Sequence, residues 1–134
     1  LSSSGVMGKV KPNKQVQADI EYGRRIATEV SRLDIGQTVC VKNGTVLAVE
    51  AFEGTDQAIR RAGEVGHGDV VVVKVPKPEY DPRFDIPCVG MQTVDSLIAA
   101  GARAIAVQAG GAVFIDKPEV LAAMDKARIA AVGF

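Results

Sequence analysis

The sequence DVVVVKV at residues 69 to 75 contains four consecutive valines and predicts a β-strand. Such a run leaves no polar face, so a strand formed by it must be covered on both sides. Strands buried in this way occur mostly in sheets that carry helices on both faces. We therefore expect this segment to be the central strand of an α/β domain.

The segments on either side alternate between helix and strand patterns. Apolar residues at three- and four-residue steps predict an amphipathic helix over residues 14–34. Asn43-Gly44 joins two β-prone runs and predicts a hairpin over residues 37–50, because both turn residues must adopt positive φ. The remaining helices are expected from Thr55, over 93–102 and over 116–127, and the remaining strands over 102–111, 112–116 (a short strand or a turn) and 129–134.

The alternation of helices and strands predicts the fold class, and individual residues predict how two of the helices begin. The fold class is α/β, a mostly parallel sheet with helices packed on it and an attached β-hairpin. Thr55 is expected to cap its helix, and Asp116 with Glu119 forms a capping-box pattern. Residues 1–13, which include Gly5, Gly8 and Pro12, are expected to be a linker from a missing N-terminal domain, and residues 14–134 the C-terminal catalytic domain.

The composition of the chain argues against nucleic acid as a partner and against a transmembrane segment. The 134 residues carry sixteen basic and sixteen acidic side chains, so bulk charge does not favour nucleic acid, and aromatics at 4 % are too few for a base-stacking surface. Cys40 and Cys88 lack CxxC spacing and are expected to be reduced thiols, which suits the cytoplasm. No apolar run approaches the length of a transmembrane segment.

The most unusual stretch is VKVPKPEYDPRFDIPCVG, residues 73 to 90. Its odd positions from 77 to 85 are all charged, and its even positions from 76 to 86 hold proline, tyrosine, phenylalanine and isoleucine. Proline favours an extended backbone in the residue before it, so alternate side chains should point to opposite sides. A charged face on a stiffened backbone indicates a functional loop, with a merely rigid surface loop as the alternative.

Three further segments join this loop where ligands collect in α/β sheets, beyond the carboxyl ends of the strands. Residues 50–56, EAFEGTD, combine carboxylates with a helix N-terminus, although simple capping explains them equally well. Residues 108–111, QAGG, allow close approach of a ligand, or form only a turn. His67, the only histidine, is more readily explained as a turn residue than as a catalytic base.

The candidate residues are thus carboxylates with Lys and Arg. Neither a phosphate-binding GxxxxGK[ST] loop nor an HExxH zinc motif is present in the sequence. Acids that hold a divalent ion, with cations that neutralise phosphate oxygens, are the groups used in metal-assisted phosphoryl transfer. Oxygen ligands favour Mg²⁺ or Mn²⁺ over Zn²⁺.

The strings DIGQTVCVKNGTVLAVEAFEGTDQAIRRAG and VKVPKPEYDPRFDIPCVGMQTVDSLIAAGARAIAVQAG resemble the C-terminal domain of the LpxI-type UDP-2,3-diacylglucosamine pyrophosphatases of lipid A biosynthesis. The resemblance runs from about residue 16 to the C-terminus and is most specific in EGTD and KPxxDxRFDxPxxG. It implies a cytoplasmic, Mg²⁺-dependent hydrolase that converts UDP-2,3-diacylglucosamine to UMP and 2,3-diacylglucosamine 1-phosphate. It also implies an N-terminal domain that completes the enzyme.

The resemblance assigns roles to particular residues. Asp81 and Arg83 match the catalytic loop, with Asp81 and Asp85 as metal ligands. The substrate-binding residues it implies are Lys74, Lys77, Glu53, Thr55, Asp56 and Gln108. Gln108 stands where the family often has an acid, so it is expected to hydrogen-bond sugar or phosphate rather than metal.

A second function, from a different class, stays open at this point. The chain could instead be a non-catalytic module that binds a nucleotide sugar or a phospholipid within a larger protein. The expected partners are a lipid-linked nucleotide sugar as substrate and the chain's own N-terminal domain. Peripheral contact with the inner face of the inner membrane and a homodimer are further expectations, and no nucleic acid is expected.

Overall fold

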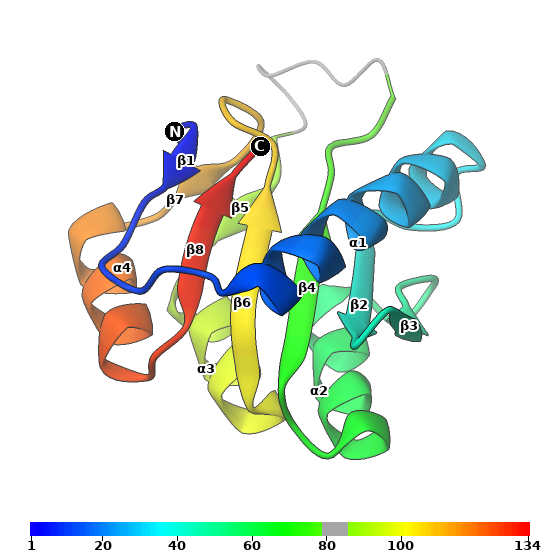
Figure 1. The fold of residues 1–134 in the computed structure, drawn as a ribbon. Helices are drawn as coiled ribbons and strands as arrows, with labels where there is room; N and C mark the ends of the chain where they lie inside the picture. The colour runs from blue at the N-terminus through cyan, green and yellow to red at the C-terminus, as the bar shows by residue number, and fades with distance from the viewer. Residues whose placement is uncertain (79–85) are drawn as a thin grey trace.

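A mixed β-sheet with helices on both faces forms the domain in the computed structural model, which describes residues 1–78 and 86–134 (Figure 1). The helices are α1 (Lys14–Arg32), α2 (Thr55–Gly66), α3 (Met91–Ala100) and α4 (Lys117–Lys126). The strands are β1 (Gly5–Val6), β2 (Thr38–Lys42), β3 (Thr45–Val49), β4 (Val70–Lys74), β5 (Cys88–Val89), β6 (Ala102–Val107), β7 (Val113–Phe114) and β8 (Ala130–Gly133). The α/β class predicted from the sequence is confirmed.

The main sheet has six strands in the order β1-β8-β6-β4-β2-β3. Strands β4, β6 and β8 are parallel and form its centre, while the β2–β3 hairpin extends it in antiparallel orientation from β4. Strands β5 and β7 form a separate parallel pair. The sequence analysis missed β1 and β5, because a two-residue strand has no periodicity to detect.

Strand β4 is buried on both faces, as its valines predict. Val70 and Val72 pack in a core with helices α2, α3 and α4, whereas Val71 and Val73 pack in a second core with α1. All four side chains are at most 1 % exposed. Burial of a valine contributes about 1.5–3 kcal/mol, so this one strand stabilises both helical layers.

Two glycines allow helices to approach closely. A Cβ at Gly23 of α1 would lie 2.7 Å from Val73 Cγ2, and one at Gly63 of α2 would lie 2.4 Å from Ala100 Cα in α3. Neither distance is compatible with a real side chain, and the second involves backbone that cannot move aside. Gly23 therefore seats α1 on the sheet, and Gly63 brings α2 against α3.

Two expected helix caps are wrong. Helix α2 begins at Thr55 itself, with Gly54 at the cap position, and the Thr55 hydroxyl instead lies 3.2 Å from the Thr38 hydroxyl. Asp116 is the cap residue of α4, but its φ is 53° and its side chain makes no capping hydrogen bond. In both cases the backbone conformation next to the helix, which the sequence pattern does not encode, prevents the expected bond.

Residues 1–13, expected to be a linker, contact the domain along their length. Strand β1 pairs with β8, Met7 N donates to Ala131 O at 2.8 Å, and Lys9 N donates to Asp125 Oδ1 at 2.8 Å. This segment therefore adds an edge to the sheet. Whether it also joins a further domain stays a prediction.

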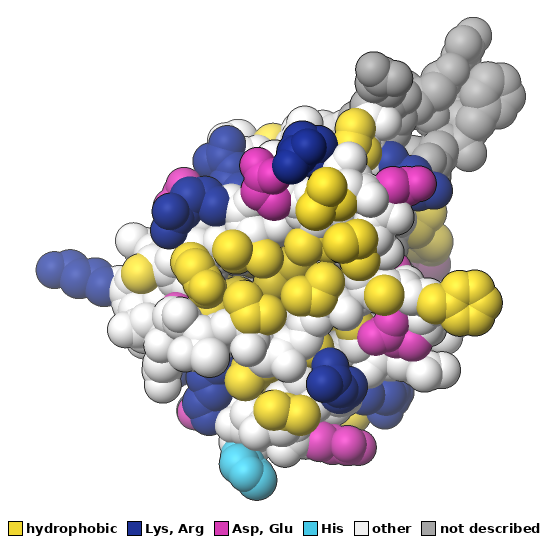
Figure 2. All heavy atoms as spheres, turned by 90° about the vertical axis from the view of Figure 1, so that its right-hand side faces the viewer, with side chains coloured by type: hydrophobic (Ala, Val, Ile, Leu, Met, Phe, Trp, Pro, Cys, Tyr) yellow, Lys and Arg dark blue, Asp and Glu magenta, His cyan; other side chains and the backbone are white. Residues whose placement is uncertain are grey.

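The opposite edge of the sheet is β3, which Figure 2 turns towards the viewer. Hydrophobic side chains gather there between rims of charged residues, and Phe52, in the segment after β3, is fully exposed. The pairing of β3 with β2 shifts register between Cys40 and Val41, which leaves Leu47 as an extra residue. Such a bulge twists an edge strand and reduces its tendency to pair with another chain.

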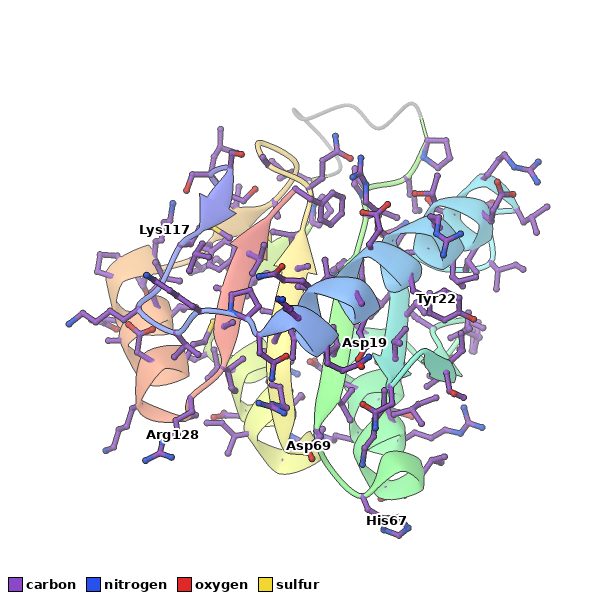
Figure 3. All side chains as sticks on the ribbon, viewed as in Figure 1. Asp19, Tyr22, His67, Asp69, Lys117 and Arg128 are labelled. Atoms are coloured by element: carbon purple, nitrogen blue, oxygen red, sulfur yellow. The ribbon has the colours of Figure 1, made fainter. Side chains whose placement is uncertain are left out.

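A buried carboxylate fixes the hairpin turn. Asp19 of α1 is 3 % exposed, and its two oxygens accept hydrogen bonds from Asn43 N at 3.1 Å and Gly44 N at 2.8 Å (Figure 3). Gln15 also donates to it at 3.1 Å. Asn43 and Gly44 have φ of 48° and 74°, so the predicted Asn-Gly turn is confirmed.

Replacing Asp19 by Ala should lower the free energy of unfolding by about 1–3 kcal/mol, because two backbone N–H groups of the turn lose their acceptor. Urea unfolding measures this change. Glu21→Ala is the matched control, since it removes an exposed carboxylate from the same helix and should change stability by less than about 0.5 kcal/mol. Equal midpoints for the two variants would contradict the role of Asp19.

Candidate functional site

The parallel strands β4, β6 and β8 have their carboxyl ends at the same end of the sheet. A cleft opens there on each face of the sheet. The first, cleft A, lies on the α1 side and has a volume of about 670 Å³. Its lining residues are Arg24, Thr28, Ser31, Arg32, Val75, Pro76, Lys77, Pro78, Gln108, Ala109 and Phe134.

Cleft B lies on the other face, where α2 and α3 begin, and has a volume of about 500 Å³. Its lining residues are Thr55, Asp56, Lys74, Cys88, Gly90, Met91, Gln92, Thr93, Ile115 and Asp116. Pro78 lines cleft A and Cys88 lines cleft B, so the chain segments before residue 79 and after residue 85 line different clefts.

Strand alternation explains how the predicted residues divide between the two clefts. Lys74 shares the face of Val70 and Val72 and lines cleft B, together with Thr55 and Asp56. The chain then turns Val75 to the α1 face, and Lys77 and Gln108 line cleft A. The substrate-binding residues expected from the sequence therefore form two groups rather than one.

Cleft B combines a cation with two helix N-termini. Glycines occupy the cap positions of α2 and α3, so neither cap residue has a side chain that could bond the first N–H groups of its helix. The backbone N–H of Gly90 donates a hydrogen bond to the Thr93 hydroxyl at 3.5 Å. Backbone N–H groups at helix starts, together with the Lys74 ammonium, form an arrangement that attracts phosphate.

The first turn of α2 is held by buried hydroxyl groups. Ser96 of α3 donates to Asp56 Oδ1 at 3.1 Å, and the Thr38 and Thr55 hydroxyls lie 3.2 Å apart. Ser96 and Thr38 are both fully buried. The EGTD turn is thus fixed from two neighbouring elements.

Cleft A has basic and aromatic residues that the sequence analysis did not single out. The Arg24 guanidinium lies 4.9 Å from the centre of the Phe134 ring, and Arg32 pairs with Glu29 at 2.8 Å. Ser31 donates to Pro76 O at 3.1 Å. Arg24, Thr28, Ser31 and Arg32 lie at helical spacing on one face, a polar stripe that could have been recognised as a second surface of the helix.

The loop that carries Gln108 is held by the first residues of the chain. Ser2 N donates to Ala112 O at 2.7 Å, Gly110 N donates to Ser2 O at 2.9 Å, and the Ser2 hydroxyl donates to Gln108 O at 2.8 Å. Ser2 is 5 % exposed. The glycines of the QAGG segment therefore form a loop on which the N-terminal segment packs.

Two other candidates lie outside the clefts. Glu53 is exposed, and the backbone N–H of Ala51, 2.8 Å from its carboxylate, lowers the pKa of Glu53. His67 ends α2 in the left-handed conformation, at the end of the sheet opposite the C-terminus (Figure 3). Its interpretation as a turn residue agrees with this position.

The remaining predicted residues, Asp81, Arg83 and Asp85, lie outside the described residues. Within residues 1–78 and 86–134, the His, Cys, Asp and Glu side chains do not form a group of three that could hold a metal ion. Cleft B does bring two carboxylates, Asp56 and Asp116, to its lining. Carboxylate oxygens fit Mg²⁺, so these two residues are compatible with the expected ion as a partial ligand set.

None of the helices in the described part of the chain has the length and apolar character needed to cross a membrane. The thiols are free, as predicted. Burial, followed by the negative charge of Glu50, raises the pKa of Cys40 to about 12, whereas Cys88 is exposed beside cleft B.

Comparison with known proteins identifies the family of this chain and a relative named for an activity. The family model described as the LpxI C-terminal domain matches residues 3–132. The protein named UDP-2,3-diacylglucosamine pyrophosphatase LpxI from Caulobacter vibrioides is 40 % identical over 129 residues, which are 90 % of this chain and 46 % of that protein. The chain thus spans less than half the length of this relative. A solved structure of Acinetobacter baumannii RibD, form 2, aligns with a TM-score of 0.48 and 15 % identity, over 88 % of this chain and 35 % of that chain.

A thiol reagent at pH 8 should modify Cys88 rapidly and leave Cys40 unmodified until the chain unfolds. The thiolate is the reactive species, and a pKa of about 12 leaves Cys40 protonated at that pH. Counting reactive thiols before and after adding urea measures this difference. Cys88→Ser should remove the rapid phase and Cys40→Ala should not, so two rapid thiols in the folded protein would contradict the assignment.

Proposed function

This chain belongs to the family of the LpxI C-terminal domain, and we propose that it is the catalytic half of a UDP-2,3-diacylglucosamine pyrophosphatase. The reaction would hydrolyse the pyrophosphate bond to give UMP and 2,3-diacylglucosamine 1-phosphate in lipid A biosynthesis. The observation that carries this proposal is 40 % identity to a protein named for that activity, over 90 % of the chain. We propose a cytoplasmic location at the inner face of the inner membrane, where an acylated substrate would be available.

The clefts support this chemistry because Lys77 and Pro78, before residue 79, line cleft A and Cys88, after residue 85, lines cleft B. Lys74 and the starts of α2 and α3 in cleft B would bind phosphate oxygens. Lys77 and Gln108 in cleft A would contact the part of the substrate that extends over the α1 face. Apolar side chains of cleft A, such as Val75 and Phe134, suit the less polar portion of that substrate.

The chemical step would use the charged loop. A water molecule forms a new P–O bond at one phosphorus of the diphosphate while the bond from that phosphorus to the bridging oxygen breaks. Asp81 would accept a proton from the water, and Arg83 would hold phosphate oxygens through its planar guanidinium. The bridging oxygen leaves on the other phosphate.

A divalent ion, Mg²⁺ or Mn²⁺, would neutralise charge on the phosphate oxygens when bound. Asp81 and Asp85 are the proposed ligands, and Asp56 and Asp116 of cleft B are the described carboxylates that could join them. Since the chain covers 46 % of its relative, we propose that an N-terminal domain supplies the rest of the substrate-binding site. A homodimer stays a prediction.

Release of UMP by the intact protein should stop in excess EDTA and return when Mg²⁺ or Mn²⁺ is added. The expected reason is that phosphate charge is no longer neutralised by an ion held on oxygen ligands. Chromatographic detection of UMP measures the reaction. Full activity in EDTA would contradict metal dependence, and substrate binding without any UMP release would favour the non-catalytic module.

Asp81→Ala should lower the rate of a single turnover by at least about a hundredfold, because the proposed proton acceptor is lost. The melting temperature should not change, and substrate should still bind through its nucleotide and acyl ends. Asp95→Ala is the control, since Asp95 is an exposed carboxylate on α3 and its loss should leave the rate unaltered. A lost rate that accompanies unfolding would instead assign Asp81 to the support of the loop.

A further inference from the structure

The buried polar side chains of the domain have their hydrogen-bond partners mostly at the clefts. Among the described residues, the buried polar or charged side chains are Ser2, Asp19, Ser31, Thr38 and Ser96. All except Asp19 bond to a residue that lines a cleft. The partners of Ser2, Ser31, Thr38 and Ser96 are, in that order, Gln108, Pro76, Thr55 and Asp56. Burying a hydroxyl group is unfavourable unless it is hydrogen-bonded, so each of these side chains is held to its partner.

Ser96 is the member of this set that contacts a charged group. Its hydroxyl is fully buried on α3 and lies 3.1 Å from Asp56 Oδ1, in a helix forty residues earlier in the chain. An ionised carboxylate only accepts hydrogen bonds, so Ser96 is the donor. A bond to a charged acceptor is stronger than one between neutral groups.

The hydrogen bond between Ser96 and Asp56 helps to fix the first turn of α2. The cap residue Gly54, with φ of 92°, has no side chain to fix the start of α2. The first turn is instead held by Thr38 from β2, which contacts Thr55, and by Ser96 from α3, which contacts Asp56. Helices α2 and α3 are also in close contact at Gly63 and Ala100, so the helix that carries the donor packs directly on the helix that carries the acceptor.

We propose that Ser96 is a positioning residue, whose hydroxyl holds Asp56 Oδ1 so that the carboxylate is presented to cleft B in one orientation. The proposal rests on the proposed function, in which Asp56 contacts the substrate or its ion. If the Asp56 carboxylate is already fixed in the free protein, its side chain loses no conformational entropy when the substrate binds. A residue that supports a site in this way changes activity without contacting the substrate.

The first test is kinetic and uses the intact protein with UDP-2,3-diacylglucosamine. Ser96→Ala should lower kcat by about tenfold or more, with a smaller change in KM, because most substrate affinity comes from the nucleotide and acyl ends. In an Asp56→Ala background, which has no side-chain acceptor for Ser96, the same substitution should change kcat by less than about twofold, since its effect passes through the carboxylate.

Ile59→Val is the matched control for stability. Ile59 is a fully buried residue of α2 that does not line a cleft, so this variant should lower the melting temperature while keeping the wild-type kcat. Wild-type kcat in Ser96→Ala would overturn the proposal. An equal loss in both backgrounds would also overturn it, because the hydroxyl would then act independently of Asp56.

A second test does not depend on activity. In the protein without substrate, the Asp56 Hα–Hβ scalar couplings, measured with selective aspartate labelling, should report one χ1 rotamer. Ser96→Ala should give averaged couplings, whereas Ile59→Val should keep the fixed rotamer. A fixed Asp56 in Ser96→Ala would overturn the proposal even if the protein hydrolyses its substrate, and an inactive wild-type protein with a fixed Asp56 would reject only the proposed function.

Discussion

The burial of β4 on both faces is the constraint on which the rest of the domain depends. Four consecutive valines send side chains alternately into the two cores, one under α1 and the other under α2, α3 and α4. The same alternation continues past the last buried residue. It turns Lys74 towards cleft B and Val75 towards cleft A, so a single strand sets both the packing and the division of the site.

The helices reach this strand closely because small residues stand at the contacts. Gly23 lets α1 lie directly over Val73, and Gly63 lets α2 lie against Ala100 of α3. Close packing of this kind leaves little freedom for relative movement. At cleft B the first turn of α2 is held in addition by Thr38 and Ser96, which favours its backbone N–H groups as binding groups with a fixed direction.

Polar groups in the interior follow a consistent arrangement. Asp19 satisfies the hairpin turn, while the buried hydroxyls hold the segments around the clefts. Ser2 is notable because it belongs to the first residues of the chain and yet bonds to Gln108 and Ala112. Residue Gln108 lines cleft A, so the N-terminal segment is connected with the rim of that cleft. A displacement of the N-terminal segment would break the hydrogen bond that holds Gln108.

Local patterns in the sequence were sufficient for most of the fold. The helix over residues 14–34, the Asn43-Gly44 hairpin and the buried strand at 69–75 each carry a periodicity or a turn signal that acts within a few residues. Strands β1 and β5 are too short to carry such a signal, and the cap at Thr55 failed because Gly54 adopts φ of 92°. Strands β1 and β5 depend on pairing with β8 and β7, which are distant in sequence, whereas the cap depends on the backbone conformation of the adjacent Gly54.

The sequence determined the chemistry of the candidate site, namely which residue types it contains. The tertiary structure decided how these residues are arranged. Residue types and the family resemblance were enough to select Lys74, Asp56 and Gln108 as candidates. Only the folded chain decided that Lys74 and Asp56 line one cleft and Gln108 the other, because that depends on which face of the sheet each helix covers. The positions of Arg24 and Ser96 were decided in the same way, since a helical residue gains its partners only when the helix is packed.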